Sequence, residues 1–305
     1  MLIYVLKRLG LGVLVIVSIS FISFMLVRVS GDPAIAMAGE GASSEEIEYV
    51  RVHYGFDRPL MTQYLIWAEG ALHGDLGESS FLHQRVTRLI KERAGVTMTL
   101  GVCALIFAIL LAVPLGVLAS IHPNSWIDRT ALTFSVVGQA MPSFWFGLLL
   151  IIIFGVYLKY LPISGSDTWK NFVMPSIALG YYATPAIMRL VRSGMLEVLA
   201  SDHIRTARAK GLRWPKILFK HALRNAILPV VSVATVQLGF MLGGSIVIES
   251  VFAFNGLGNL AWSSIGRSDL PVVQAIVLVL GTIFVLLIFI SDLFSAFLDP
   301  RIRST

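Results

Sequence analysis

The sequence contains little charge for its length. Charged residues occupy 14% of its 305 positions, and 56% of positions are hydrophobic. Soluble globular domains carry about 25% charged residues, so this composition excludes an ordinary soluble domain and indicates an integral membrane protein. The one cysteine, Cys103, lies within an apolar run. It has no partner for an intrachain disulfide, so cysteine usage does not report the redox compartment.

The sequence also lacks the residue patterns that carry catalysis or nucleotide binding. It contains no G-x-x-x-x-G-K-[ST] phosphate loop, so we expect no ATP hydrolysis by this chain itself. His53, His73 and His83 share one segment without the H-E-x-x-H spacing of a zinc helix. We therefore predict that the chain is not an enzyme and has no catalytic residue, no metal site and no bound cofactor.

Long apolar runs account for most of the remaining sequence. A helix needs about 20 apolar residues to cross a bilayer, and continuous runs favour helices over a barrel, whose strands alternate. The first run is too long for the apolar core of a signal peptide, so we expect it to be retained. We predict an all-α polytopic membrane protein with six transmembrane helices, at Leu9–Val27, Ala94–Ile121, Thr130–Leu158, Asn171–Met188, Asn225–Ile248 and Leu270–Ser291.

The positive residues predict which side of the membrane each loop occupies. Six spans place both termini on one side, and short cytoplasmic loops are rich in Lys and Arg. Lys7, Arg8, Arg189 and Arg192 share the predicted cytoplasmic side with the basic segment 201–224. This assigns 1–30 to the first helix, 31–93 to an extracytoplasmic loop region, 94–300 to a core with five helices, and 301–305 to a cytoplasmic tail. The basic residues at 85–93 oppose the bias, but long loops translocate largely regardless of charge.

The extracytoplasmic segment 31–93 is expected to fold. Ser44 followed by acidic residues predicts the start of a helix over 44–54. Pro59–Ala71 is aromatic and apolar, and Val86–Arg93 is amphipathic. Two interpretations stay open for this segment: a cap that packs on its own helices, or a contact surface for a soluble substrate-delivery protein. Within the spans, Gly239, Gly243 and Gly244 are expected to permit close helix approach.

The segment Ser201–Arg224 is polar and basic between two membrane-length runs. It carries seven cationic residues and one acid, Asp202. Ser201 or Asp202 can cap a helix over Ile204–Lys210, Gly211 can end it, and Pro215 can begin a second helix. Ala207 and Ala209 predict a smooth face that a partner can approach. Both a protein partner and anionic lipid fit this pattern, whereas the lack of interleaved aromatics argues against nucleic acid.

Ordered sequence blocks along nearly the whole chain resemble one permease family. The loop contains Arg205-Thr206-Ala207-Arg208-Ala209-Lys210-Gly211 and His221-Ala222-Leu223-Arg224-Asn225. Other blocks are Gly31-Asp32-Pro33-Ala34, Asp57-Arg58-Pro59-Leu60, Gly74-Asp75-Leu76-Gly77, Pro142-Ser143-Phe144-Trp145, Gly256-Leu257-Gly258 and Asp299-Pro300-Arg301. Together they resemble the dipeptide/oligopeptide permeases of binding-protein-dependent ABC importers, a family that also includes nickel and glutathione permeases.

The basic segment departs from the general form of that family's coupling loop. Arg205-Thr206-Ala207 stands where the general pattern has Glu-Ala-Ala, and His221–Arg224 replaces Ile-x-Leu-Pro. Both departures resemble the peptide subfamily. Asn255 and Ile288 also differ from residues often found in the family.

The resemblance implies a type I ABC importer permease fold and a place in a larger complex. The chain would be one of two homologous permease subunits in a bacterial inner membrane, moving di- or oligopeptides by alternating access. Two cytoplasmic ATPase subunits, which hold ATP and Mg²⁺, and an extracytoplasmic binding protein would be its partners, with membrane lipid around it. The implied ATPase-docking residues are Asp202, Arg205, Thr206, Ala207, Arg208, Ala209, Lys210, Gly211, His221, Arg224 and Asn225.

Other functions remain open from sequence. Nickel or glutathione import would use the same architecture. A passive channel or a membrane enzyme with an outer catalytic loop is a different class, and the sequence shows no nucleophile or metal constellation for the latter. The substrate-contacting residues are not predictable from these patterns.

Overall fold

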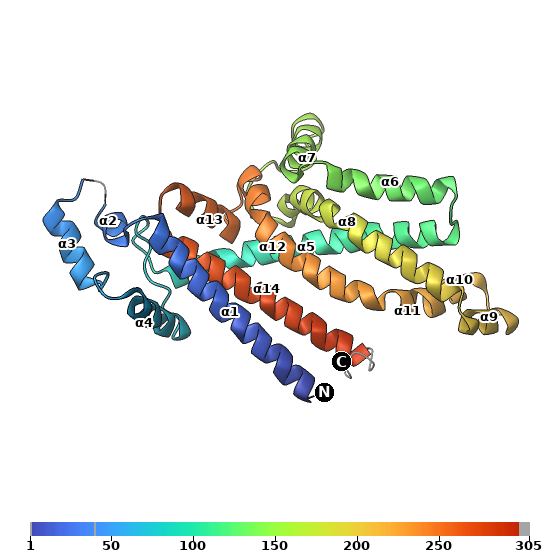
Figure 1. Cartoon of the computed structure of the whole chain (residues 1–305). Coiled ribbons are helices and arrows are strands. Elements are labelled where there is room, and N and C mark those ends of the chain that lie inside the picture. The colour runs from blue at the N-terminus through green and yellow to red at the C-terminus, as the bar shows by residue number, and fades with distance from the viewer. Residues whose placement is uncertain (1, 40, 299–305) are drawn as a thin grey trace. The chain divides into compact units, whose positions relative to one another are not determined.

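The computed structural model describes residues 2–39 and 41–298, and these residues are largely helical (Figure 1). Within this part of the chain, the one β-type pairing is an isolated bridge between Glu78 and Arg85. The Asp299-Pro300-Arg301 block and the tail predicted at 301–305 lie outside the described residues. The described chain divides into two compact units, the N-terminal unit (2–97 and 255–286) and the central unit (98–254 and 287–298).

The N-terminal unit is built from helices at both ends of the sequence. It contains the first part of α5 and most of α14. Its helices are α1 (Leu2–Ser30), α2 (Pro33–Ala38), α3 (Ser44–His53), α4 (Leu60–Leu72), the start of α5 (Val86–Ile121), α13 (Leu257–Gly266) and the start of α14 (Leu270–Leu298).

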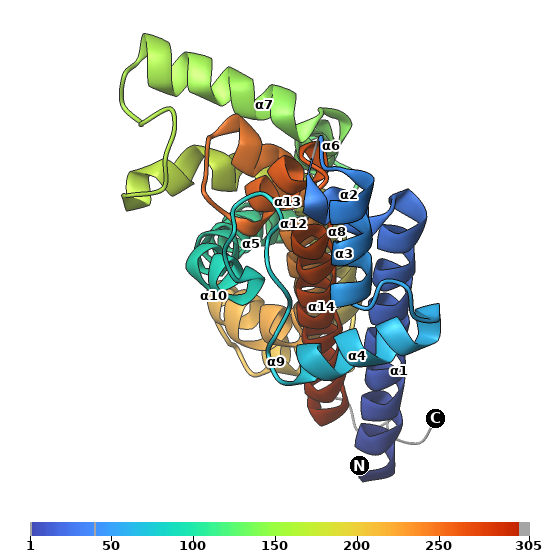
Figure 2. The same ribbon diagram turned by 90° about the vertical axis from the view of Figure 1, so that its left-hand side faces the viewer.

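Two packing contacts hold the N-terminal unit together. One is an apolar cluster in which Val86 and Leu89 of α5 meet Leu257 of α13 and Val272 of α14. The other is the side-by-side packing of α1 and α14, where a methyl group added at Gly281 would lie 3.0 Å from Ile19. Helices α2 to α4 lie along one side of this unit in Figure 2. The extracytoplasmic segment predicted from sequence therefore is folded.

Polar contacts fix the start of α2 and α3. Asp32 accepts a hydrogen bond from the N–H of Ala34 at 2.9 Å and pairs with Arg51 at 2.7 Å. Burial acts to raise the pKa of Asp32. The hydrogen bonds from Ala34 and Arg51, with the positive charges of Arg51 and Arg28, outweigh burial and lower that pKa.

The predicted cap at Ser44 is wrong by one residue. Ser43 is the N-cap and forms a capping box with Glu46, because its side chain reaches the Glu46 N–H.

The central unit is organised around one long helix, α8 (Trp169–Leu199), which is heavily buried. It packs against α6 (Trp126–Ala140), α7 (Ser143–Leu150) and α12 (Leu228–Val251). Glycines allow α8 to approach its neighbours closely. A methyl group added at Gly180 of α8 would clash with the backbone oxygen of Ala104 in α5, and one added at Gly138 of α6 would lie 2.5 Å from the ring of Tyr181 in α8. The hydroxyl of Tyr181 then donates to the carbonyl of Phe134 at 2.5 Å.

The predicted close approach at Gly243 and Gly244 is wrong for this chain, because a methyl group at either position would meet nothing within 4 Å. Both glycines lie on the exposed face of α12. In the central unit, glycines that do meet close neighbours include Gly116 of α5, Gly138 of α6 and Gly180 of α8.

The span predicted at Thr130–Leu158 is broken rather than continuous. Two segments bent by 100° replace it, α6 and the pair formed by α7 with the π-helical segment η1 (Ile151–Tyr157). Met141 is extended because a residue before proline is driven away from helical angles, and Pro142 then precedes α7. The sequence-based prediction had placed Pro142 inside one continuous span.

Four helices are long and apolar enough to cross a membrane by length and composition: α1, α5, α12 and α14. The bent pair raises the number to five if it counts as one span. The run predicted at Asn171–Met188 lies within α8, which this criterion does not include because prolines and polar residues dilute its apolar character. The predicted boundary at 93/94 also falls inside a helix, since Val86–Arg93 is the start of α5.

Candidate functional site

The basic segment folds as a short excursion between two long helices of the central unit. The chain leaves α8 at Leu199, forms α9 (Asp202–Ala209), turns, and continues through α10 (Trp214–Lys216). The π-helical segment η2 (Ile217–Leu223) and α11 (Arg224–Ala226) then lead to α12. Figure 1 shows α9 and α10 at the end of α8, where the chain turns back. The helix, turn and helix predicted from sequence is therefore present, with π-helical rather than α-helical geometry over most of the second part.

Two apolar side chains attach α9 to the rest of the unit. Ile204 is fully buried and Ala207 is 7% exposed, and α9 packs against η2. The expectation that Ala207 belongs to a smooth outer face is wrong, because its position three residues after Ile204 places it on the inner face. Ala209 and Gly211 are exposed. The outward surface of α9 therefore consists of polar and small residues.

Local contacts shape both ends of α9. Ser201 has the extended conformation of an N-cap, but its hydroxyl makes no capping bond and contacts His203 Nδ1 at 2.9 Å instead. The predicted side-chain cap is therefore absent here, although the helix begins where expected. Arg205 pairs with Asp202 at 3.2 Å, and both side chains are highly exposed, so this pair adds little stability.

Gly211 makes the turn that the sequence predicts. Its φ of +71° lies in the left-handed region, where a side chain is strained. Its N–H donates to Arg208 O at 2.9 Å, and Leu212 N–H donates to Ala207 O at 3.3 Å, so the turn satisfies carbonyls at the end of α9. The Arg208 guanidinium lies 5.1 Å from the centre of the Trp214 ring. This stacking contact links the two sides of the turn.

Polar contacts also join the second part of the segment to the first. Asn225 Nδ2 donates to His221 O at 3.1 Å and lies 3.5 Å from Nε2 of His203. Ile217, Leu218 and Ala222 are buried, whereas Phe219 is 61% exposed. Sequence reasoning missed His203, Trp214 and Phe219 as members of this surface, although an aromatic residue within a strongly basic segment is itself a signal of an interface.

The surface formed by 201–224 is strongly positive. All seven cationic side chains are exposed: Arg205, Arg208, Lys210, Arg213, Lys216, Lys220 and Arg224. Asp202 is the one acidic residue in the segment, and Arg205 already pairs with it. The structure thus brings the predicted residues into one continuous segment, of which Ala207 faces inward and His221 is half-buried. An acidic surface is the natural complement of this patch.

A buried ion pair joins α8, the helix that leads into the segment, to α6. Arg192 of α8 donates to both carboxylate oxygens of Asp128 in α6, at 2.7 and 2.6 Å. Asn124 N–H adds a bond to the same carboxylate at 2.9 Å. Asp128 is 4% exposed, so water screens this pair poorly. This contact fixes the α6–α8 packing two turns before α8 ends.

The described residues hold no group of three or more His, Cys, Asp or Glu side chains placed to bind a metal ion. The basic segment itself presents exposed cationic side chains on a folded surface. Long helices on both sides of this folded, exposed basic segment define a class: a polytopic membrane component.

Comparison with known proteins identifies that component. Residues 112–304 match the model for the binding-protein-dependent transport system inner membrane component, and residues 1–101 match the model for its N-terminal region. The chain belongs to the family of binding-protein-dependent transport system inner membrane components. It is accordingly a multi-pass inner membrane protein and a transport component rather than an enzyme.

Curated relatives match over essentially the full length. The chain is 40% identical over 304 residues to the glutathione transport system permease protein GsiC of Pectobacterium atrosepticum, with 99% of each chain covered. It is 38% identical over 336 aligned positions to the dipeptide transport system permease protein DppB of Escherichia coli K12, again covering 99% of each.

A solved structure shares the fold. The inward facing MetNI methionine ABC transporter contains a chain that matches with a TM-score of 0.59 at 21% identity. The match covers 69% of this chain and 96% of that one. The expected ABC importer permease fold is thus confirmed.

Proposed function

We propose that the chain is one of two homologous permease subunits of an ATP-driven importer for small peptides. The names of the relatives support this substrate class, since dipeptide and glutathione permeases both match at close to 40% identity over whole chains. Glutathione is itself a small peptide, so it is the second candidate substrate. An extracytoplasmic binding protein delivers the peptide, and the permease pair alternates between outward-facing and inward-facing states.

The segment 201–224 is the surface on which an ATPase subunit docks, and the exposed cationic face of α9 is the observation that carries this proposal. A helix that lies in a lipid interface needs an apolar face turned toward the acyl chains. In α9 the apolar residues Ile204 and Ala207 face the protein interior and are buried. The outward face can therefore bind an acidic partner, but it has nothing to insert into lipid.

ATP and Mg²⁺ belong to two ATPase subunits, one for each permease. ATP binding brings the two ATPases together, and α9 transmits that displacement to α8 and α12, the helices that flank the segment. The chain binds no cofactor of its own and no nucleic acid. Membrane lipid surrounds the spans.

The same proposal fixes the orientation. The surface 201–224 is cytoplasmic, both termini lie on that side, and the segment 31–93 is extracytoplasmic, in agreement with the excess of Lys and Arg in the predicted cytoplasmic loops. A Cys103→Ser chain carrying Ala209→Cys tests the side. A membrane-impermeant maleimide must label the cysteine in inverted vesicles and not in right-side-out cells; labelling in intact cells would contradict the orientation.

Reconstituted transport tests the function. The complete complex, purified with its ATPase and binding-protein partners, is placed in liposomes that contain no anionic lipid. ATP-dependent uptake of labelled dipeptide and of labelled glutathione is then compared. Arg208→Glu with Lys216→Glu is expected to abolish uptake and ATPase co-purification, because it reverses charge on the docking surface. Lys170→Glu, an exposed charge reversal at the opposite end of α8, is the matched control.

Each result has a definite meaning. Loss of partner binding in the double variant, with normal behaviour of the control, supports docking at 201–224. Normal ATPase binding in the double variant contradicts it. Uptake of neither peptide by the intact complex contradicts the substrate class, and solute flux through the purified chain without ATP or partners favours a passive channel.

A further inference from the structure

A cavity within the N-terminal unit has the features of a ligand site that is separate from the docking surface. Its volume is about 830 Å³, within the usual range of about 300–1,000 Å³ for small-molecule pockets. It is lined by the end of α1, the start of α5, the start of α14 and the loop between α4 and α5. All its lining residues belong to this one compact unit.

Two buried donors on the cavity wall lack acceptors in the described structure. Gln274 of α14 is 6% exposed, and its Nε2 makes no hydrogen bond. Arg28 of α1 likewise has a buried Nε without a partner. The Arg28 guanidinium lies 4.9 Å from the centre of the Phe24 ring and 4.8 Å from that of Phe56. A buried donor without an acceptor is costly, so this wall is suited to an anionic oxygen.

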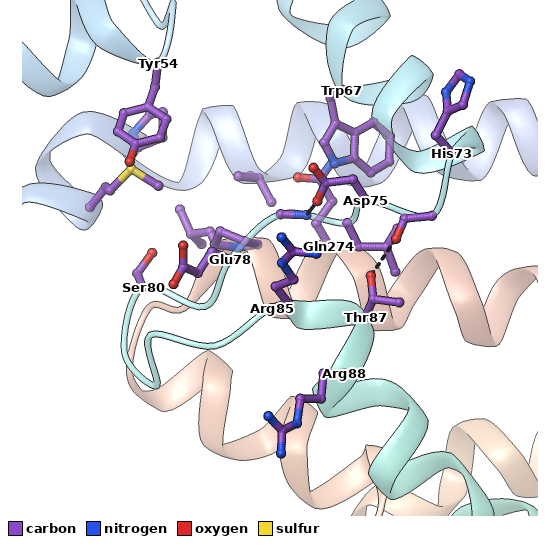
Figure 3. A pocket seen from close by; sticks show the side chains of 18 of the residues that line it. Tyr54, Trp67, His73, Asp75, Glu78, Ser80, Arg85, Thr87, Arg88 and Gln274 are labelled. Carbon is purple, nitrogen blue, oxygen red and sulfur yellow. Dashed lines mark hydrogen bonds between the residues drawn. The ribbon is translucent and has the colours of Figure 1, made fainter.

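The cavity is also lined by charged side chains of both signs, and only two of those on α5 pair with each other. Arg88 and Glu92 form an ion pair at 2.7 Å. Arg85 and Lys91 then supplement Arg28, while Asp75 and Glu78 supply negative charge. Among the described residues, these four side chains take part in no ion pair. Figure 3 shows Arg85, Asp75 and Gln274 grouped together, with His73 and Arg88 turned away from that group.

The loop that carries these side chains is held by its own hydrogen bonds. Thr87 Oγ1 donates to Gly74 O at 2.7 Å, Val86 N–H donates to Gly77 O at 3.0 Å, and Ser79 N–H donates to Gln84 O at 2.9 Å. Ser79 also donates through its hydroxyl to Asp269, which precedes α14, and Asp269 accepts Ser80 N–H at 3.1 Å. The loop between α4 and α5, which carries Asp75, Glu78 and Arg85, is therefore held in place by hydrogen bonds.

We propose that this cavity binds a small zwitterion with a free carboxylate, such as an amino acid or a short peptide. The carboxylate accepts hydrogen bonds from Gln274 Nε2 and Arg28 Nε, and the ammonium group lies near Asp75 and Glu78. The indole of Trp67 and the ring of Phe56 line the same cavity and supply its apolar surface. The ligand is of the class that the proposed importer transports, so the inference builds on the proposed function. Calorimetry measures binding without transport, so a failure to bind would overturn this inference and leave the proposed function standing.

Calorimetric titration tests the inference directly. The full-length chain in detergent is titrated with L-alanyl-L-alanine, with its C-terminal amide and with inorganic phosphate. The free peptide is expected to bind, whereas the amide, which lacks the carboxylate, is expected to bind at least about tenfold more weakly because a charged acceptor is lost. No binding of the free peptide at millimolar concentration, or equal binding of the amide, would overturn the proposal. Preferential binding of phosphate would also overturn it and would indicate a lipid headgroup site.

Gln274→Leu locates the ligand. Leucine has a similar size and removes a donor that is unpaired in the unliganded protein, so the variant is expected to fold. It should weaken peptide binding by about tenfold or more. His73→Gln changes a lining residue that is turned away, and is the matched control. If the leucine variant fails to fold, Arg28→Lys is tested in its place, because it retains the charge and loses the Nε donor. Unchanged affinity in the folded position-274 or position-28 variant places the ligand elsewhere and overturns the proposal.

Discussion

Arg192 and Asp128 form a bidentate ion pair that joins α8 to α6 near the end of α8 that leads into the basic segment. Both oxygens of the carboxylate are occupied by the guanidinium, and Asn124 N–H occupies a further acceptor position. The pair connects the helix that leads into 201–224 with a helix that is not part of that segment. Its geometry suggests three kinds of disruption: of the pair, of the turn that follows it, and of the helix packing around it.

Asp128→Asn is expected to destabilise the central unit. The substitution leaves Arg192 without its counter-charge in a poorly hydrated site, and removing one partner of a buried pair costs about 3–5 kcal/mol. Thermal unfolding of the solubilised chain measures the effect. Arg129→Gln, which neutralises an exposed charge at the next position, is expected to leave the melting temperature unchanged. Equal effects of the two substitutions would show that the pair contributes no special stability.

Gly211→Ala is expected to impair docking more than folding. The added methyl group meets no atom within 4 Å, but the φ of +71° must be kept at a strain of about 1 kcal/mol or relaxed by moving the turn. Gly211→Asn should have a smaller effect, because asparagine tolerates left-handed angles better. ATPase co-purification with the full complex is the measurement. Alanine and asparagine variants that retain partner binding equally would argue against a role for the turn conformation.

Gly180→Ala is expected to disrupt the packing of α5 against α8. The new methyl group would overlap the backbone oxygen of Ala104, so the two helices must separate. We expect a loss of about 1–3 kcal/mol in stability, the usual cost of overpacking. Gly243→Ala is the matched control, since its surroundings are open and alanine favours helix. A fall in the melting temperature of the isolated chain for the Gly243 variant, equal to that for Gly180, would contradict the packing described here.

The Asp32–Arg51 contact predicts an acid-sensitive step in the N-terminal unit. The pKa of Asp32 is lowered in the folded chain. The stability that this ionised carboxylate contributes to the folded chain is therefore complete above the ordinary aspartate pKa of about 3.9. That stability is lost as the pH falls through the lower pKa of the folded chain. Hydrogen exchange in α2 and α3 should accelerate in that range. Asp32→Asn should remove the acid dependence of exchange around Ala34; an unchanged profile would assign the step to another carboxylate.

Part of the fold is readable from local sequence because local chemistry decides it. Gly211 and Pro215 mark the turn and the restart of the basic segment, and the structure places both where those residue types predict. The apolar run at Leu9–Val27 lies within α1 for the same reason. Which side of α9 faces inward was not readable in this way. Ala207 suits either face by size, and its burial depends on the packing of Ile204 against η2.

The cavity in the N-terminal unit could not be predicted, because distant residues form it. Arg28, Trp67 and Gln274 lie in three helices and meet only when α1, α4 and α14 assemble. The break at Pro142 was missed for a different reason. Proline in a membrane helix is compatible with a mild kink as well as with a sharp bend, and the extended angles of Met141 distinguish the two.

The bend at Met141–Pro142 has a consequence for counting. A chain whose two ends share one face must cross the bilayer an even number of times. If the two termini share one face, as proposed above, and α1, α5, α8, α12 and α14 each cross once, the bent pair of α6 with α7 and η1 provides one complete crossing. If that pair instead entered and left by the same face, every later loop would change sides, including 201–224. Whether the subunit crosses the bilayer an even number of times therefore depends on the bend at Met141–Pro142.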